Sequence, residues 1–219
     1  MNMQECAYTG IIPVSLPKPQ HEALRSTMHA VVEYVTLASQ LGTDDVGKGV
    51  YFEAFLFYDP DALFRGMARV EFGWLGGTDN KHLEQKFEFV VREKFSWLSR
   101  NAPRIIARLG RHTASSAEDR RRNKAERVPP GAIVFPCQIP GFMGRKTVWM
   151  GLGVSGLYGW RDHAAVTLAA NAMRAHPNPD VRWHIQGMDV REVACVRGNP
   201  YWEFLERELL ESHLAYLAG

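Results

Sequence analysis

Two pairs of β-rich segments are the feature that most restricts how this chain can fold. The first pair is "VYFEAFLFY" (50–58) and "LFRGMARVEFGWL" (63–75), joined by the turn "YDPDA". The second pair is "AIVFPCQI" (132–139) and "KTVWMGLGVSG" (146–156), joined by the turn-rich "PGFMGR". Because strands that arrive in pairs form hairpins, and because helical patterns separate the pairs, the sequence predicts an antiparallel sheet in an α+β domain.

Helical periodicity flanks both pairs of strands. The first helix is predicted over 21–41, with Gly42 at its C-terminal end. A second helix is predicted to begin at "GGTDN", to be interrupted by Pro103, and to continue as a short helix that ends at Gly110. The sequence also predicts a helix over 160–176 and an amphipathic helix at the C-terminus.

Three sections of the chain follow from these elements. Residues 1–20 are predicted to form an N-terminal arm, residues 21–176 the α+β domain, and residues 177–219 a C-terminal extension with the amphipathic helix. The polar stretch 111–131, which includes "RRRNK", is predicted to be a loop or a solvated helix. Pro136 lies inside the strand predicted at 132–139, which indicates an edge strand or a bulge.

Charge and cysteine usage exclude several classes of protein. The chain has 26 Lys and Arg against 24 Asp and Glu, a net charge of +2, which argues against a general nucleic-acid surface. The N-terminus lacks the pattern of a signal peptide, and no segment approaches about 18 consecutive apolar residues, so no membrane span is expected. Three widely spaced cysteines predict reduced thiols in the cytoplasm.

The stretch "GVSGLYGWRDH" (153–163) is the strongest candidate for a site. Glycines here allow close approach of the backbone, and the unpaired N–H groups at the start of the following helix favour an anion. Asp162 is expected either to cap this helix or to orient His163. His163 is expected either to make a satisfied polar contact or, oriented by a carboxylate, to serve as a base or a metal ligand. Ser155 is not expected to be a hydrolase nucleophile, because "GVSGL" lacks the final glycine of that motif.

Further candidate residues lie elsewhere. Arg100, Arg104 and Arg108 are spaced by four, so one helix face presents three guanidiniums either to a carboxylated ligand or to solvent. Tyr158 and Trp160 are expected to stack on a flat ligand or to fill an oligomer interface. His29 is the predicted metal ligand, and His112 and His163 are further histidines considered as ligands.

The second strand pair and the helix after it resemble the haem-degrading-domain superfamily, the GlcG/HbpS-like proteins. In an uncharacterised cytosolic branch of that superfamily, the last hairpin ends in Val-Ser-Gly and Asp-His follows at the start of a helix. Here "VWMGLGVSGLYGWRDHAAV" places Val154, Ser155, Gly156, Asp162 and His163 on that pattern, with "YGW" inserted. A weaker similarity comprises "GGTDN", "WLSRNAPRIIARLG" and "RHTASS", and the resemblance spans about residues 25–175.

The resemblance implies a profilin-like fold and a cytosolic, homo-oligomeric protein that binds a small molecule, either haem or another carboxylated metabolite. The ligand would lie near the 153–163 corner and the arginine-bearing helix. If the ligand is haem, the candidate axial ligands are His29, His112 and His163. Its expected contacts are Ser155, Gly156, Tyr158, Trp160, Arg100, Arg104, Arg108 and His112. Two alternatives stay open. One is an enzyme that uses His163 and Asp162 for proton transfer, and the other is an assembly module without a ligand.

Overall fold

A computed structural model describes residues 15–38, 49–57, 67–75, 81–110, 112–119, 128–157 and 160–186. Its helices are α1 (Lys18–Ala38), α3 (Lys81–Leu109) and α4 (Trp160–Ala175). Its strands are β1 (Val50–Phe57), β2 (Met67–Leu75), β3 (Ala114–Ser115), β4 (Ala132–Gln138), β5 (Val148–Ser155) and β6 (His184–Ile185). None of these helices is long and apolar enough to cross a membrane.

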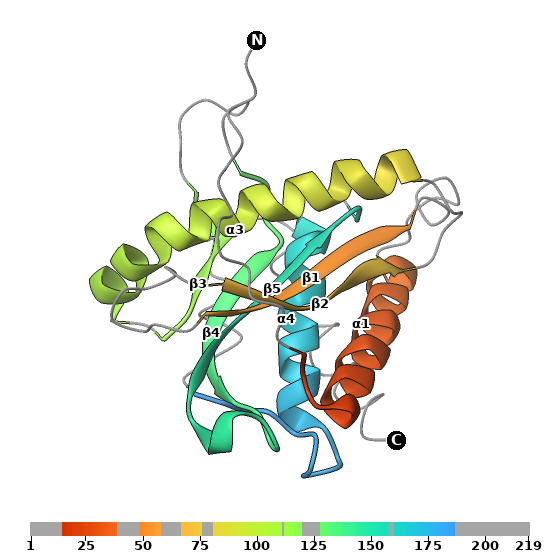
Figure 1. Ribbon diagram of the computed structural model, residues 1–219. Coiled ribbons are helices and arrows are strands. Elements are labelled where there is room, and N and C mark those ends of the chain that lie inside the picture. Colours follow the sequence, from red (N-terminus) through yellow and green to blue (C-terminus); the bar gives the residue numbers. More distant parts are fainter. Residues whose placement is uncertain are drawn as a thin grey trace.

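The strands form one antiparallel sheet with helices on both faces. The strand order is β2-β1-β5-β4-β3, and β6 also pairs with β4. Helix α3 crosses one face, while α1 and α4 pack together on the other (Figure 1). The predicted α+β class, the antiparallel sheet and both hairpins are therefore confirmed.

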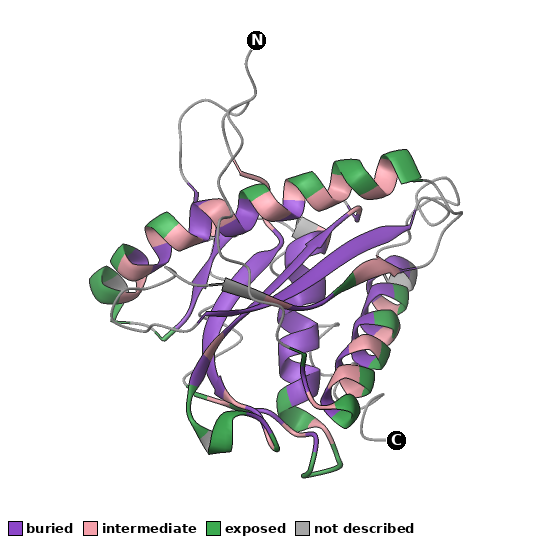
Figure 2. Cartoon of the chain, in the orientation of Figure 1, coloured by how far each residue is buried: buried purple, intermediate pink, exposed green. Residues whose placement is uncertain are grey.

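Strand β1 shows why the sheet is covered on both faces. Its alternate residues divide between two cores, with Phe52 on the face of α1 and α4 and Phe55 on the face of α3. All eight of its residues are buried, and Figure 2 shows β1, β4 and β5 as the buried strands of the sheet. A strand buried on both faces should read as an unbroken apolar run, and Glu53 is the exception in "VYFEAFLF".

The predicted break at Pro103 is wrong, because α3 continues through it as a single helix of 29 residues. A proline inside a helix removes one hydrogen bond and costs about 3 kcal/mol. Here the turns on either side of Pro103 are anchored on the sheet, since Leu98, Ala102 and Ile105 are buried in the core beneath α3. We attribute the continuity of α3 to this packing.

Pro136 does not mark an edge strand, because β4 lies between β5 and two short strands. On that outer side, β3 pairs with Ile133 and Val134, and β6 pairs with Cys137 and Gln138. Pro136 falls in the gap between the two partners, where its missing N–H interrupts neither ladder.

The domain extends beyond both predicted boundaries. Helix α1 begins at Lys18, inside the predicted arm, and Gln20 is buried. At the other end Trp183 is fully buried, and its Nε1–H donates to Gln20 Oε1 at 2.9 Å. Residues up to about 186 therefore belong to the α+β domain. Four earlier predictions lie outside the described residues: Tyr158, the "GGTDN" start of the second helix, the "RRRNK" stretch and the C-terminal helix.

Candidate functional site

The corner after β5 is held by a buried ion pair. Lys94 of α3 donates to Asp162 Oδ2 at 3.0 Å, and also to the carbonyl oxygen of Val154. Asp162 Oδ1 accepts the N–H of Leu157 at 2.9 Å. Burial raises the pKa of Asp162 and lowers the pKa of Lys94, and the attraction between the two groups opposes both shifts. Both carboxylate oxygens of Asp162 are thus bound to protein groups.

Gly131 makes room for this ion pair. It has φ +117°, and a Cβ atom there would overlap Asp162 Cβ, lie 2.8 Å from Lys94 Nζ and lie 2.9 Å from the Val154 carbonyl oxygen. Its own carbonyl oxygen accepts the Val154 N–H at 2.8 Å. The position directly before β4 therefore needs glycine, both for its conformation and for space.

His163 is also buried and bound. Its Nδ1 lies 3.3 Å from Ser115 Oγ, and the side chain is 1 % exposed. Ser115 in turn begins the short 3-10 helix η1 (Ser116–Glu118), where its Oγ accepts the Ala117 N–H and its own N–H donates to Glu118 Oε1. This reciprocal arrangement is a capping box. Part of the polar stretch predicted as a loop or solvated helix is therefore buried structure.

We expect Ser115→Ala to reduce the free energy of unfolding by about 1–2 kcal/mol, since it removes an N-cap acceptor and leaves His163 Nδ1 without its hydroxyl partner. Urea unfolding of the two proteins measures the difference. Ser99→Ala is the matched control, because the Ser99 hydroxyl donates only to the Ser96 carbonyl within α3. Equal stability of the Ser115 variant and the wild type would contradict a structural role for this contact.

Two of the three predicted arginines line a groove. Arg104 and Arg108 share a groove of about 520 Å³ beside η1, and the other groups around it are Trp97, Asn101, Ile105, Ala107 and Glu118. This volume lies within the range of small-molecule sites, about 300–1,000 Å³. Arg100 does not line the groove, and its Nε–H donates to the Ser96 carbonyl oxygen instead.

Among the remaining predicted site residues that the structure describes, Ser155, Gly156, His112 and His29 do not line this groove. Ser155 is buried at the end of β5, and Gly156 packs against the backbone of Gly49 and Val50. Trp160 begins α4. His112 is exposed just beyond α3, and His29 is exposed on α1, across the sheet from the arginines.

The three histidines considered as axial ligands of haem lie in different surroundings. His163 is buried and lies within hydrogen-bond distance of Ser115, whereas His112 and His29 are exposed. The groove beside His29 is also lined by Lys18, His21, Glu22, Arg25 and Ser26, which are all polar or charged residues. Within the described residues no three His, Cys, Asp or Glu side chains gather to hold a metal ion.

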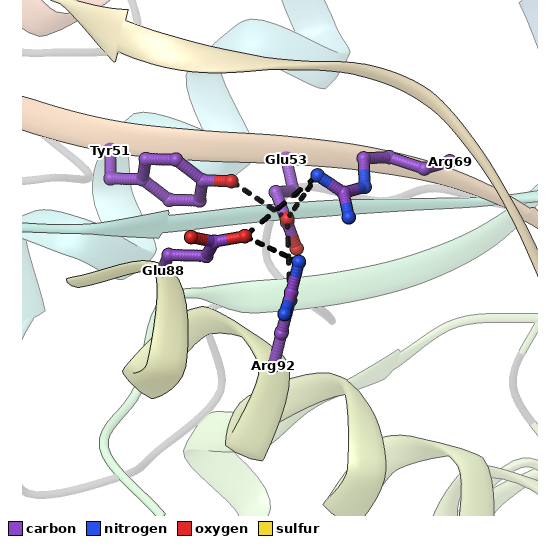
Figure 3. Close-up of polar contacts among 5 residues, drawn as sticks. All are labelled: Tyr51, Glu53, Arg69, Glu88 and Arg92. Carbon is purple, nitrogen blue, oxygen red and sulfur yellow. Dashed lines mark hydrogen bonds and ion pairs between the residues drawn. The ribbon is translucent and has the colours of Figure 1, made fainter. Parts of the chain in front are cut away.

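A second polar cluster surrounds Glu53 on the face of the sheet that α3 covers (Figure 3). The Tyr51 hydroxyl donates to Glu53 Oε1 at 2.8 Å. Arg69 of β2 lies 3.6 Å from the same oxygen, and Arg92 of α3 lies 3.8 Å from it. Both arginines also pair with Glu88 of α3. We call Glu53, Arg69, Glu88 and Arg92 the charge ring.

Glu53 is the buried member of the charge ring. Its side chain is fully buried, and its Oε2 has no hydrogen-bond partner among the described groups. Burial raises the pKa of Glu53 to about 7, against the lowering effects of the Tyr51 hydrogen bond and of the two arginines. Burial also raises the pKa of Tyr51, and the neighbouring Glu53 raises it further.

Sequence reasoning missed Lys94 and Glu53. Lys94 falls on the apolar stripe of α3, and its whole side chain is buried. Glu53 interrupts an otherwise apolar strand, and that single acidic residue was the available signal. A charged residue at a core position is rarely buried without a partner, and this rule would have singled out both positions.

Comparisons with known proteins add no relative. A scan against protein-family models, a search of the curated proteins and a search of the solved structures each return no match. The resemblance to the haem-degrading-domain superfamily therefore stays a prediction, and the functional argument rests on the geometry of this chain.

Proposed function

We propose that this protein binds a small carboxylate with an apolar body in the groove between the C-terminal half of α3 and η1. The observation that carries the proposal is the pair Arg104 and Arg108, one helical turn apart on a groove whose other walls include Trp97 and Ile105. Guanidinium groups recognise carboxylates by paired hydrogen bonds, and the flat indole suits an apolar or aromatic body.

The contacts of η1 support this proposal, because they hold in place the part of the groove lining that Glu118 provides. Glu118 lines the groove, and its carboxylate holds the Ser115 N–H in the capping box. Ser115 in turn contacts the buried His163. In this proposal Asp162 and His163 position the groove. We do not propose proton transfer for them, because both are buried and bound to protein groups.

The test uses 3-phenylpropionate as the probe and 3-phenylpropionamide as its uncharged counterpart. We expect the carboxylate to raise the melting temperature of the protein and to bind saturably in calorimetry, whereas the amide binds more weakly. A hydrogen bond to a charged group contributes about 1.5–3 kcal/mol, so Arg104→Ala with Arg108→Ala should weaken binding at least about tenfold.

Arg100→Ala is the matched control, because it removes an exposed arginine from the same helix without touching the groove. Binding by the control and loss in the double variant would support the proposal. Equal binding by acid and amide, or equal losses in both variants, would overturn it. A haem titration is a separate experiment, and a saturable change in the haem spectrum would support the haem prediction. Cytoplasmic location and homo-oligomerisation stay predictions from the sequence.

A further inference from the structure

We propose that the charge ring is a pH-responsive contact between the β1–β2 hairpin and α3, in which protonation of Glu53 releases Arg69 and Arg92 from the buried carboxylate. The ring connects three elements, with Glu53 on β1, Arg69 on β2, and Glu88 and Arg92 on α3 (Figure 3). This inference is independent of the proposed ligand groove.

The geometry favours a proton at Glu53. Its Oε1 accepts the Tyr51 hydroxyl, while its Oε2 is buried without a donor. Neither arginine reaches hydrogen-bond distance of Glu53, at 3.6 and 3.8 Å. An ionised carboxylate in this position would have a buried oxygen, Oε2, without a described donor, and the hydrogen bond from Tyr51 compensates only part of the cost of burial. The protonated form is therefore favoured more than in water. Burial raises the pKa of Glu53 to about 7, in agreement with this geometry.

The titratable and charged groups described around Glu53 come from its own strand and from the elements packed against it. Strand β1 contributes Tyr51, β2 contributes Arg69, and α3 contributes Glu88 and Arg92. On the β5 side Glu53 pairs with Gly153, which has no side chain. With Glu53 ionised, two carboxylates balance two guanidiniums. With Glu53 protonated, Glu88 is the remaining counter-charge within the charge ring, and both arginines are already partly exposed to solvent.

Protons can reach the ring from solvent. Side-chain exposure rises from 0 % at Glu53 to 20 % at Arg69, 26 % at Glu88 and 37 % at Arg92. The ring therefore joins a buried carboxyl group to the protein surface. A change in the charge of Glu53 would alter the attraction that holds α3 against the hairpin.

The sign of the stability effect follows from linkage. The pKa of Glu53 is higher in the folded protein, about 7, than its ordinary value of 4.5. The stabilisation from the bound proton is therefore fully present below pH 4.5 and is lost as the pH rises through about 7. Above that pH the ionised Glu53 attracts both arginines, and this attraction limits the loss of folding stability.

The experiment follows the Glu53 carboxyl carbon and the Nε–H exchange of Arg69 and Arg92 by NMR between pH 5 and 9 in the full chain. We expect the carboxyl to titrate near pH 7. Because exchange of guanidinium protons is base-catalysed and speeds up with pH, each rate is compared with that of a free arginine side chain at the same pH. Relative to that reference, we expect both Nε–H groups to be more protected above the midpoint. In Glu53→Gln, a neutral mimic of the protonated form, the exchange should lose this pH-dependent step. Glu93→Gln, an exposed acid of α3, is the matched control and should keep it.

Tyr51→Phe keeps the test decisive if Glu53→Gln fails to fold. It removes the hydrogen bond that lowers the pKa of Glu53, so the midpoint should move to higher pH. A midpoint near 4.5, an unmoved midpoint in Tyr51→Phe, or arginine exchange that ignores the titration would each overturn the proposal.

Discussion

Lys94→Met is expected to destabilise the protein by about 3–5 kcal/mol, because it leaves Asp162 buried without its ion-pair partner. Methionine matches the length of the lysine stem, so packing is largely preserved and the loss reports the missing charge. Chemical denaturation at pH 7 measures the difference. A loss below about 1 kcal/mol would show that the buried carboxyl does not need the ammonium group.

The acidic range provides a second measurement on the same variant. Without Lys94 the pKa of Asp162, already raised by burial, rises further. A raised folded-state pKa stabilises the protein below the unfolded pKa and destabilises it as the pH rises. The loss in the free energy of unfolding caused by Lys94→Met should therefore be smaller at pH 4 than at pH 8. Lys86→Met, at an exposed position of the same helix, should show neither effect.

Gly131→Ala is expected to cost roughly 2–6 kcal/mol. A non-glycine residue at φ +117° costs about 1–3 kcal/mol in backbone strain. Crowding of a packed interior adds about 1–3 kcal/mol, because the new methyl group would press on Asp162, Lys94 and the Val154 carbonyl group. The drop in the midpoint of urea unfolding measures the sum.

Gly110→Ala separates the two contributions. Gly110 has φ +60°, but a Cβ atom there meets nothing within 4 Å. Its substitution should therefore cost about 1–2 kcal/mol, the strain alone. Equal losses at Gly110 and Gly131 would mean that the buried ion pair adjusts to the extra methyl group at no cost.

Local pattern in the chain was sufficient for most of the elements. The β-rich composition of 50–58 and 132–139 identified β1 and β4, and the three-and-four spacing of apolar residues identified α1. These signals come from neighbouring residues, whose side chains must alternate on a strand or share one face of a helix. They failed at Pro103 and Pro136, where packing on the sheet and the gap between β3 and β6 determine the outcome.

The candidate site depends on contacts that no local pattern contains. Asp162 and His163 were identified as a pair, but their partners Lys94 and Ser115 lie 68 and 48 residues earlier in the chain. Arg104 and Arg108 share a helix face by spacing alone, whereas the opposite wall of their groove comes from η1. Which charged groups meet depends on the order of the strands and on the face each helix covers.

The charge ring shows the same division. The sequence places an acidic residue in the middle of an apolar strand, and nothing nearby compensates its charge. The antiparallel sheet brings Arg69 to its side, and the packing of α3 brings Glu88 and Arg92. Helices and strands follow from periodicity over neighbouring residues. The burial of a side chain, its pKa and its ion pairs depend instead on which distant segments pack together and exclude water around it.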